Sequence, residues 1–270
     1  MADVLYMAGY PRPDPRNENY NDVKHVVFDG AEGYGASIPI QKALNERGDV
    51  IIAYEMNGVD IPRDHGYPLR VIVPGHVAAR SVKWVNKITL TDEESQSHWQ
   101  QHDYKGFGPS HTLQDSDYSK SMSIQEMSVQ SAILDPLPGD TVVLGNDNQI
   151  VVSGYAVSGG GKSIYRVDVS GDGGKSWVDA TLKVPNQAPD RNWAWTKWSA
   201  TVPVSAGETE IDLVCKAVDS GYNMQPDSFE GVYNARGVLS SAWQHSSIKI
   251  GNVGKDLHGD IQGSNKPQNL

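Results

Sequence analysis

The sequence predicts an α+β region followed by an all-β sandwich, and two observations support this division. The first 125 residues mix short apolar runs of strand type with helix-type segments. From about residue 127, short strand-type runs are separated by turn signals, a pattern typical of an immunoglobulin-like sandwich. We therefore expect a first domain over residues 1–125, a second domain over 126–250 and a disordered tail over 251–270.

The first region contains both helix and strand signals. Residues 2–9 are typical of the end of a helix that stops at Gly9, and a second helix is expected over 39–44. The polar, irregular stretch 91–118 predicts a long ordered loop, and loops of that length in compact domains are usually functional. Short apolar, often β-branched runs predict strands over 23–28, 50–54, 69–73, 81–85 and 87–90.

The second region is predicted to be β-structure throughout. Residues 170–177, SGDGGKSW, predict a hairpin between two strands. The single cysteine, Cys215, excludes the usual immunoglobulin disulfide and falls at an apolar strand position, where we expect a small buried side chain. The expected strands are 149–155, 165–170, 193–199, 210–217 and 247–250.

The composition excludes several classes of protein. The 270 residues have a net charge of −10, and an acidic chain binds nucleic acid poorly because phosphate contacts need Lys and Arg. No stretch approaches the roughly 18 apolar residues of a membrane-spanning helix. One cysteine rules out an internal disulfide framework and any multi-cysteine zinc or iron–sulfur site.

Three well-known motifs do not hold in this sequence. The loop SGGGKS at 158–163 lacks the first glycine of a phosphate-binding loop, and no helix is expected after it. His98 and His102 are four residues apart, but HWQQH has Gln where a metalloprotease needs Glu, so we interpret both as surface histidines. The hydrolase motif G-x-S-x-G is absent. The sequence therefore assigns no metal-ligating residue.

The strongest group of candidate functional residues lies within 54–107. Residues 51–110 have a net charge of −1, whereas the rest of the chain carries −9. Arginine binds phosphate and other oxyanions through two hydrogen bonds, and lysine adds a point charge. An anion-binding site is one interpretation of this group, and solvated surface charge is the other. The group consists of His65, Arg70, Arg80, Lys83, Tyr104 and Lys105.

Long stretches of the chain resemble one family. AYEMNGVDIPRDHGYPLRVIVPGHVAARSVKWV (53–85) and EESQSHWQQHDYKGF (93–107) closely resemble the sulfite oxidase family of molybdopterin enzymes. The resemblance continues through GYAVSGGGKSIYRVDVSGDGGKSW (154–177), CKAVDSGYNMQPD (215–227) and NARGVLSSAW (234–243). It covers about 22–250, and the form SHWQQHDYKGF favours sulfite oxidase over the related nitrate reductases.

The resemblance implies a fold, a cofactor and a reaction. The fold is part of an α+β molybdopterin-binding domain followed by an immunoglobulin-like dimerisation domain, so a homodimer is expected. The reaction is oxidation of sulfite to sulfate by oxygen-atom transfer at a molybdenum–molybdopterin centre, with electrons passed to an acceptor such as cytochrome c. By match, Tyr104 and Arg236 are the catalytic residues. The residues matched to cofactor binding are His65, Arg70, Ser81, Val82 and Lys83.

The sequence also departs from the family. The family's molybdenum thiolate lies in a C-A-G-N-R stretch upstream of every residue here, and Cys215 matches a core strand position instead. Glu32 stands roughly where the family has Asp in a loop that contacts the pterin. The resemblance thus implies a chain that lacks the first part of its catalytic domain and the molybdenum-ligating cysteine. We expect the isolated chain to be inactive.

Two other functions remain open from the sequence. One is a non-catalytic short product that dimerises through its sandwich, and the other is an immunoglobulin-like adhesion domain. The intact block 54–107 argues against adhesion, because an adhesion module has no use for it. By family, the expected compartment is the mitochondrial intermembrane space, with the peroxisome as the alternative.

Overall fold

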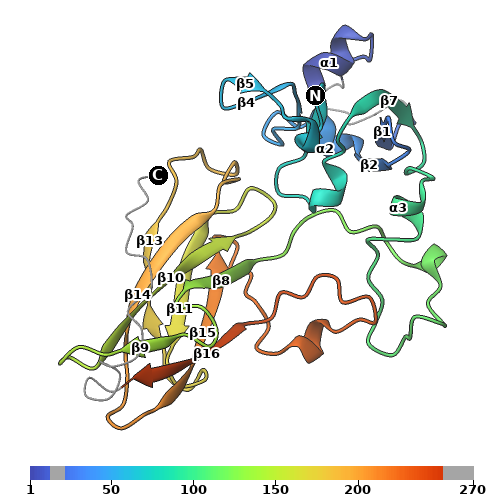
Figure 1. Cartoon of the computed structure of the whole chain (residues 1–270). Coiled ribbons are helices and arrows are strands. Elements are labelled where there is room, and N and C mark those ends of the chain that lie inside the picture. The colour runs from blue at the N-terminus through green and yellow to red at the C-terminus, as the bar shows by residue number, and fades with distance from the viewer. Residues whose placement is uncertain (13–21, 252–270) are drawn as a thin grey trace.

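The computed structural model describes residues 1–12 and 22–251. These residues form two regions with separate hydrophobic cores, shown in Figure 1 at the upper right and the lower left. The predicted tail, 251–270, lies outside the described residues apart from Gly251. Within the described residues, no helix is both long and apolar enough to cross a membrane.

The first region is built on a three-stranded antiparallel sheet in the order β2-β1-β7. Alternate residues of β1 point into the core, where Val26 and Phe28 are fully buried. Burying a side chain such as Phe28 contributes about 1.5–3 kcal/mol. The bounds are β1 His25–Gly30, β2 Gly35–Pro39, β7 Val85–Thr91, and two helices, α1 Ala2–Met7 and α2 Ile40–Leu44. Both predicted helices are therefore confirmed.

Short elements complete the first region. The pairs β3–β6 and β4–β5 are each two-stranded and antiparallel. The bounds are β3 Ile51–Ala53, β4 Glu55–Met56, β5 Val59–Asp60, β6 Arg70–Ile72, the 3₁₀ helices η1 Arg63–His65, η2 Ala78–Arg80 and η3 Tyr118–Lys120, and the helix α3 His98–Gln101.

Two predictions for this region are wrong. Residues 81–85 are not a strand, because Trp84 has a left-handed backbone (φ 51°) and β7 begins only at Val85. Residues 91–118 are not irregular throughout, because α3 forms within them. Tertiary contacts stabilise α3: Trp99 stacks on Tyr34 at 5.4 Å between ring centroids, and Gln100 is fully buried. His98 and His102 lie at this helix and are exposed, as predicted.

The second region contains two sheets that share one core. The first sheet has the order β13-β14-β10-β8 and the second β12-β11-β15-β16-β9. Val152 and Trp198 of the first sheet lie in the same buried cluster as Val169, Leu213 and Ile248 of the second. The bounds are β8 Gln130–Asp135, β9 Thr141–Val143, β10 Gln149–Val157, β11 Ile164–Ser170, β12 Val178–Asp179, β13 Thr181–Lys183, β14 Thr196–Pro203, β15 Glu210–Asp219, β16 Gln244–Gly251 and the 3₁₀ helix η4 Phe229–Val232.

The five predicted strands of this region are present, with one shift. The strand predicted over 193–199 begins only at Thr196, because the two preceding tryptophans have other partners. Trp193 donates its Nε1 hydrogen to Asp49 Oδ2 at 2.6 Å, and Trp195 stacks on Tyr155 at 4.3 Å. The predicted hairpin at 170–177 is confirmed by the antiparallel pairing of β11 with β12.

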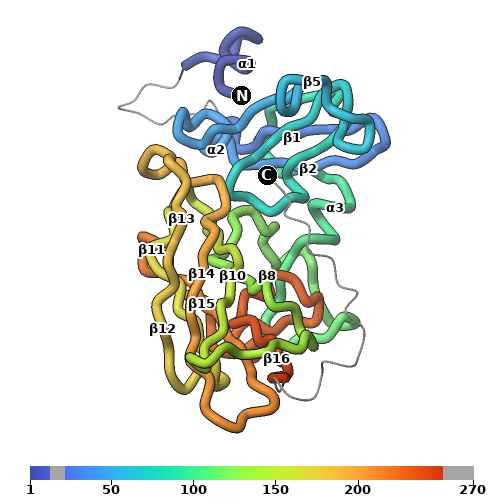
Figure 2. The backbone as a smooth tube through the Cα atoms, turned by 60° about the vertical axis from the view of Figure 1, so that its left-hand side comes forward, coloured from blue at the N-terminus to red at the C-terminus, as the bar shows by residue number. Residues whose placement is uncertain are grey.

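A loop of the second region, residues 187–195, contacts the first region (Figure 2). Asp49 accepts hydrogen bonds from the Arg191 guanidinium and from Trp193. The Lys42 ammonium lies 4.5 Å from the centroid of the Trp193 ring. A Cβ atom at Gly75, where φ is 74°, would lie 2.7 Å from the same ring, so only glycine allows this close approach.

Candidate functional site

Three predicted cofactor-binding side chains lie together on the turns between η1 and β7. Gly66 has a φ of 111°, and a Cβ atom there would lie 2.8 Å from Lys83 Cβ, so the two turns touch. Arg70 Nη1 donates to the His65 carbonyl at 3.0 Å. Lys83 Nζ donates to the Asp64 carbonyl at 2.8 Å. The turns thus hold the Arg70 and Lys83 cations beside His65, and we call these three residues the cationic group.

The two cations of this group, Arg70 and Lys83, form no ion pair within the described residues. In the same part of the chain, no carboxylate forms an ion pair with Arg63 either. Arg70 also has a buried Nε atom without a hydrogen-bond partner. A buried donor of this kind is costly unless an acceptor reaches it. The arrangement therefore suits an anionic ligand.

The other two predicted cofactor-binding residues, Ser81 and Val82, have internal contacts. The Ser81 hydroxyl accepts a hydrogen bond from the Val73 backbone N–H at 3.1 Å, and its own O–H can still donate. The Val82 side chain is buried in the core of the first region, and its carbonyl accepts from the Val71 N–H at 2.9 Å. Both residues lie directly before Lys83 in the same turn.

Tyr104, the predicted active-site tyrosine, has a left-handed backbone with a φ of 42°. Its N–H donates to Asp103 Oδ1 at 2.9 Å, and its carbonyl accepts from the Ile124 N–H at 2.9 Å. Its phenol lies close enough to Tyr34 to affect that group electrostatically. Burial first, and then Tyr104, raise the pKa of Tyr34 to about 12, so Tyr34 is neutral at physiological pH.

Arg236 reaches the first region from the loop between β15 and β16. Its guanidinium forms an ion pair with Asp103, directly before Tyr104, and its Nη1 donates to the Tyr118 hydroxyl at 3.0 Å. The arginine and the aspartate are each about one-quarter exposed, so solvent still reaches this pair. The structure thus brings the two predicted catalytic residues together through Asp103.

Sequence reasoning did not identify Asp103 or Tyr118. The signal for Asp103 was available, since an acidic residue precedes the predicted tyrosine. Nothing in the sequence pointed to Tyr118, which lies in a polar stretch 118 residues before its partner Arg236.

Two cations that the sequence placed in the anion-binding group are interior residues. Arg80 is fully buried and Lys105 is 2% exposed. Arg80 donates to the Ile124 carbonyl and to Gln100 Oε1, and Lys105 donates to the Tyr118 carbonyl. Both side chains are therefore held by internal partners, although one buried nitrogen of Arg80, Nη2, has no hydrogen-bond partner.

Cys215 lies in β15 at the centre of the sandwich and is fully buried, as predicted. Burial raises the pKa of its thiol to about 11, with smaller opposing effects from hydrogen bonds. Its Sγ atom is 3.4 Å from the Ser131 hydroxyl. Within the described residues, no group of three or more His, Cys, Asp or Glu side chains could hold a metal ion.

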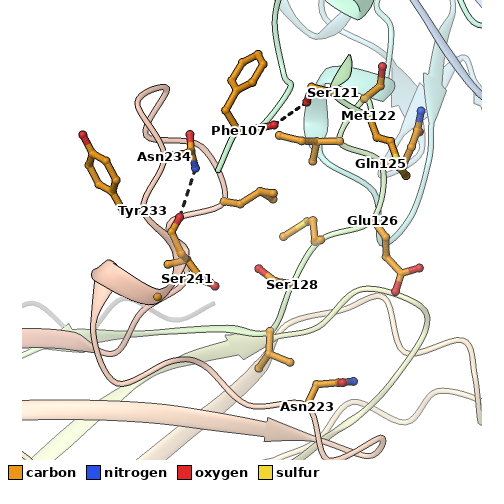
Figure 3. Close-up of a pocket in the computed structure, with 18 of the residues that line it drawn as sticks. Phe107, Ser121, Met122, Gln125, Glu126, Ser128, Asn223, Tyr233, Asn234 and Ser241 are labelled. Carbon is orange, nitrogen blue, oxygen red and sulfur yellow. Dashed lines mark hydrogen bonds between the residues drawn. The ribbon is translucent and has the colours of Figure 1, made fainter. Parts of the chain in front are cut away.

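A cavity of about 990 Å³ lies between the segment 120–129 and the loop after β15. Figure 3 shows side chains from both segments around it, among them Met122 and Gln125 on one side and Tyr233 and Asn234 on the other. Its lining includes neither Tyr104 nor Arg236, but it includes Ile124 and Asn234, which are hydrogen-bonded to them.

Comparison with known families divides the chain in two. Residues 1–99 match the oxidoreductase molybdopterin binding domain. Residues 121–251 match the molybdenum-cofactor oxidoreductase dimerisation domain. The chain therefore combines a molybdopterin-binding domain with a dimerisation domain, mostly of β-structure with few helices.

Individual relatives identify the family within this class of oxidoreductases. The sulfite oxidase of Gallus gallus is 50% identical over 249 residues, which cover 90% of this chain and 52% of that protein. The mitochondrial sulfite oxidase of Homo sapiens is 46% identical over 256 residues, 93% of this chain and 45% of that protein. The solved structure of the sulfane dehydrogenase SoxCD from Paracoccus pantotrophus matches with a TM-score of 0.67 at 26% identity, covering 87% of this chain and 57% of that one. The chain belongs to the sulfite oxidase family of molybdopterin oxidoreductases.

The chain spans about half the length of the curated relatives it matches. The family uses a molybdenum–molybdopterin cofactor, and the side chains present fit one part of it. The cationic group and the unpartnered Arg70 Nε fit a phosphate-bearing ligand. The described cysteine does not fit the role of a metal thiolate, because Cys215 is enclosed in the sandwich core.

Proposed function

We propose that this chain provides cofactor-anchoring and substrate-binding residues for the oxidation of sulfite to sulfate. The observation that carries the proposal is the contact of Arg236, from the dimerisation domain, with Asp103 beside Tyr104. Neither domain alone would place an arginine and a tyrosine at one position. The identity with sulfite oxidases over most of the chain supports the choice of substrate.

The roles of the residues follow from their chemistry. Sulfite is an oxyanion, and the Arg236 guanidinium attracts it while the Tyr104 hydroxyl can donate a hydrogen bond. Asp103 partly neutralises Arg236 before substrate binds, so sulfite competes with this carboxylate. His65, Arg70 and Lys83 would hold the phosphate of the cofactor, which when bound supplies oxygen-atom transfer and passes electrons to an acceptor such as cytochrome c.

Sulfite binding to the full chain tests this proposal. Under nitrogen, isothermal titration should show that Arg236→Met weakens sulfite binding at least ~10-fold, because a charged hydrogen bond is lost. Lys120→Met is the matched control, since Lys120 is 82% exposed and close to the site in the first region. Equal affinities for Arg236→Met and the parent chain would contradict the proposed site.

Whether this chain oxidises sulfite by itself is a separate question. Its one cysteine, Cys215, is buried and the pKa of its thiol is raised, so it is unsuited to bind molybdenum as a thiolate. We expect no sulfite-dependent reduction of ferricyanide or cytochrome c, and no stoichiometric molybdenum, in the purified chain. The burial of Cys215 also favours the alternative function, in which the chain is a non-catalytic product that dimerises. Robust sulfite oxidation by this chain would overturn the view that it lacks the thiolate ligand.

The assembly and the compartment are part of the proposal. The two-sheet domain, which we interpret as immunoglobulin-like, would form a homodimer, as the match to a dimerisation domain supports. Sedimentation of a clean monomer at micromolar concentration would count against it. Two relatives with mitochondrial names support a mitochondrial location, and we propose the intermembrane space.

A further inference from the structure

Tyr104 has a backbone conformation that needs support. A φ of 42° lies in the left-handed region, which is unfavourable for an aromatic residue and persists only where surrounding contacts hold it. Its two sequence neighbours have opposite charges and different partners. Asp103 pairs with Arg236, whereas Lys105 turns into the first region, where its ammonium is 4.0 Å from Glu94 Oε1.

One path of hydrogen bonds joins the fully buried Arg80 to Tyr104. Arg80 Nε donates to the Ile124 carbonyl at 2.8 Å. The N–H of the same Ile124 donates to the Tyr104 carbonyl at 2.9 Å. Ile124 is therefore held on one side by Arg80 and holds Tyr104 on the other.

A second path closes this into a ring. Arg80 Nη1 donates to Gln100 Oε1, and Gln100 Nε2 donates to Glu94 Oε2 at 2.8 Å. The Glu94 carboxylate also accepts from the Ser123 hydroxyl at 2.6 Å and faces Lys105. We call this closed set the Arg80 ring. Its members are Arg80, Ile124, Tyr104, Lys105, Glu94 and Gln100.

The ring has the character of a positioning device. Arg80 and Gln100 are fully buried and Lys105 nearly so, and buried charged hydrogen bonds are strong and directional. Arg80 also directly precedes the turn 81–83, which carries Lys83, one of the residues proposed to anchor the cofactor. The turn and the backbone of Tyr104 are therefore joined through Arg80 and Ile124.

We propose that Arg80 and Glu94 are positioning residues that hold Tyr104 in its left-handed conformation and so set the direction of its hydroxyl. The importance of that direction rests on the proposed function, in which Tyr104 contacts sulfite. The hydrogen bonds of the Arg80 ring do not depend on the proposed function. Neither residue touches the substrate in this account, because each acts through its partners in the ring.

The experiment places 3-fluorotyrosine at position 104 of the full chain and records its ¹⁹F spectrum. The parent chain should give one narrow line. Arg80→Met and Glu94→Gln should each shift or split that line by more than its width, and Arg80→Lys should restore part of the parent spectrum. Val26→Ala is the control, because it removes core volume from β1 without touching the ring.

The outcomes separate the proposals. A parent-like line in folded Glu94→Gln overturns the positioning role, and so does an equal change in Val26→Ala. If Arg80→Met fails to fold by circular dichroism, the milder Glu94→Gln and Ser123→Ala decide the question. The spectrum needs neither cofactor nor sulfite, so an unchanged line leaves the proposed function intact, and failed sulfite binding leaves the positioning role intact.

Discussion

The two regions hold their functional residues by different means. In the sandwich, strands of up to ten residues pack two sheets around one apolar core. In the candidate site of the first region, strands and 3₁₀ helices of three residues are fixed mainly by side chains bonded to backbone carbonyls, as Arg70 is to His65 and Trp84 to Arg63. Stability and chemistry therefore depend on different residues, and substitutions can separate the two.

The largest expected effect is in the sandwich core. Leu213→Ala removes a fully buried side chain, and we expect a loss of about 2–5 kcal/mol in the free energy of unfolding. Urea denaturation followed by tryptophan fluorescence measures it. Val151→Ala in β10, where the side chain is 65% exposed, should change stability by less than about 0.5 kcal/mol. Similar losses for both would contradict the core described here.

The next effect uses Cys215 as a reporter of the sandwich. Because burial raises the pKa of its thiol to about 11, an aromatic disulfide reagent at pH 8 should react at least ~100-fold more slowly with the folded chain than with the chain in urea. Leu213→Ala should accelerate the reaction. Phe28→Ala, in the separate core of the first region, should not. Equal acceleration by both variants would show that the regions open as one unit.

A smaller effect is expected at the cationic group. Arg70→Met should weaken binding of pyrophosphate about 10-fold, because one charged donor pair is removed, while the unfolding free energy changes little. Lys87→Met is the control, since Lys87 lies two residues into β7 and is exposed. Calorimetric titration at low salt measures both. An unchanged affinity would exclude Arg70 from the anion site.

The smallest effect concerns the contact between the regions. The hydrogen bond from Arg191 lowers the pKa of Asp49. The stabilisation is therefore present above the ordinary pKa of an aspartate and is lost as the pH falls through the lowered pKa of the folded state. Asp49→Asn should cost under about 1 kcal/mol at pH 7, because Arg191 is 45% exposed. Urea unfolding at pH 7 and pH 3 should show a smaller difference in Asp49→Asn than in the parent chain.

The regular strands were predictable and the polar connections were not. The apolar runs 149–155 and 210–217 predict strands from their own residues. The segment 81–85 was also predicted to be a strand, but Trp84 is left-handed and the Ser81 hydroxyl is bonded to Val73, so β7 begins only at Val85. Helix α3 depends on contacts with residues more than 60 positions away, as in the bonding of Gln100 to Ser37, and no local pattern carries that information.

Residue chemistry located a candidate anion-binding group, and the resemblance added Arg236 and assigned a role to each matched residue. The matched residues His65, Arg70 and Lys83 do lie together, and Tyr104 and Arg236 meet through Asp103. From residue type alone, Arg80 and Lys105 could not be distinguished from ligand-binding cations, because burial depends on the tertiary structure.

The tripeptide 103–105 has a consequence for how the sequence can change in length. The first side chain, of Asp103, pairs with Arg236 of the second region, and the third, of Lys105, points into the first region toward Glu94. The left-handed residue between them directs the two side chains apart. A single-residue insertion or deletion here should break at least one of these two ion pairs and turn Tyr104 away from its present direction. Residues 108–115 are all exposed, so length variation among relatives should collect there while 103–105 stays constant.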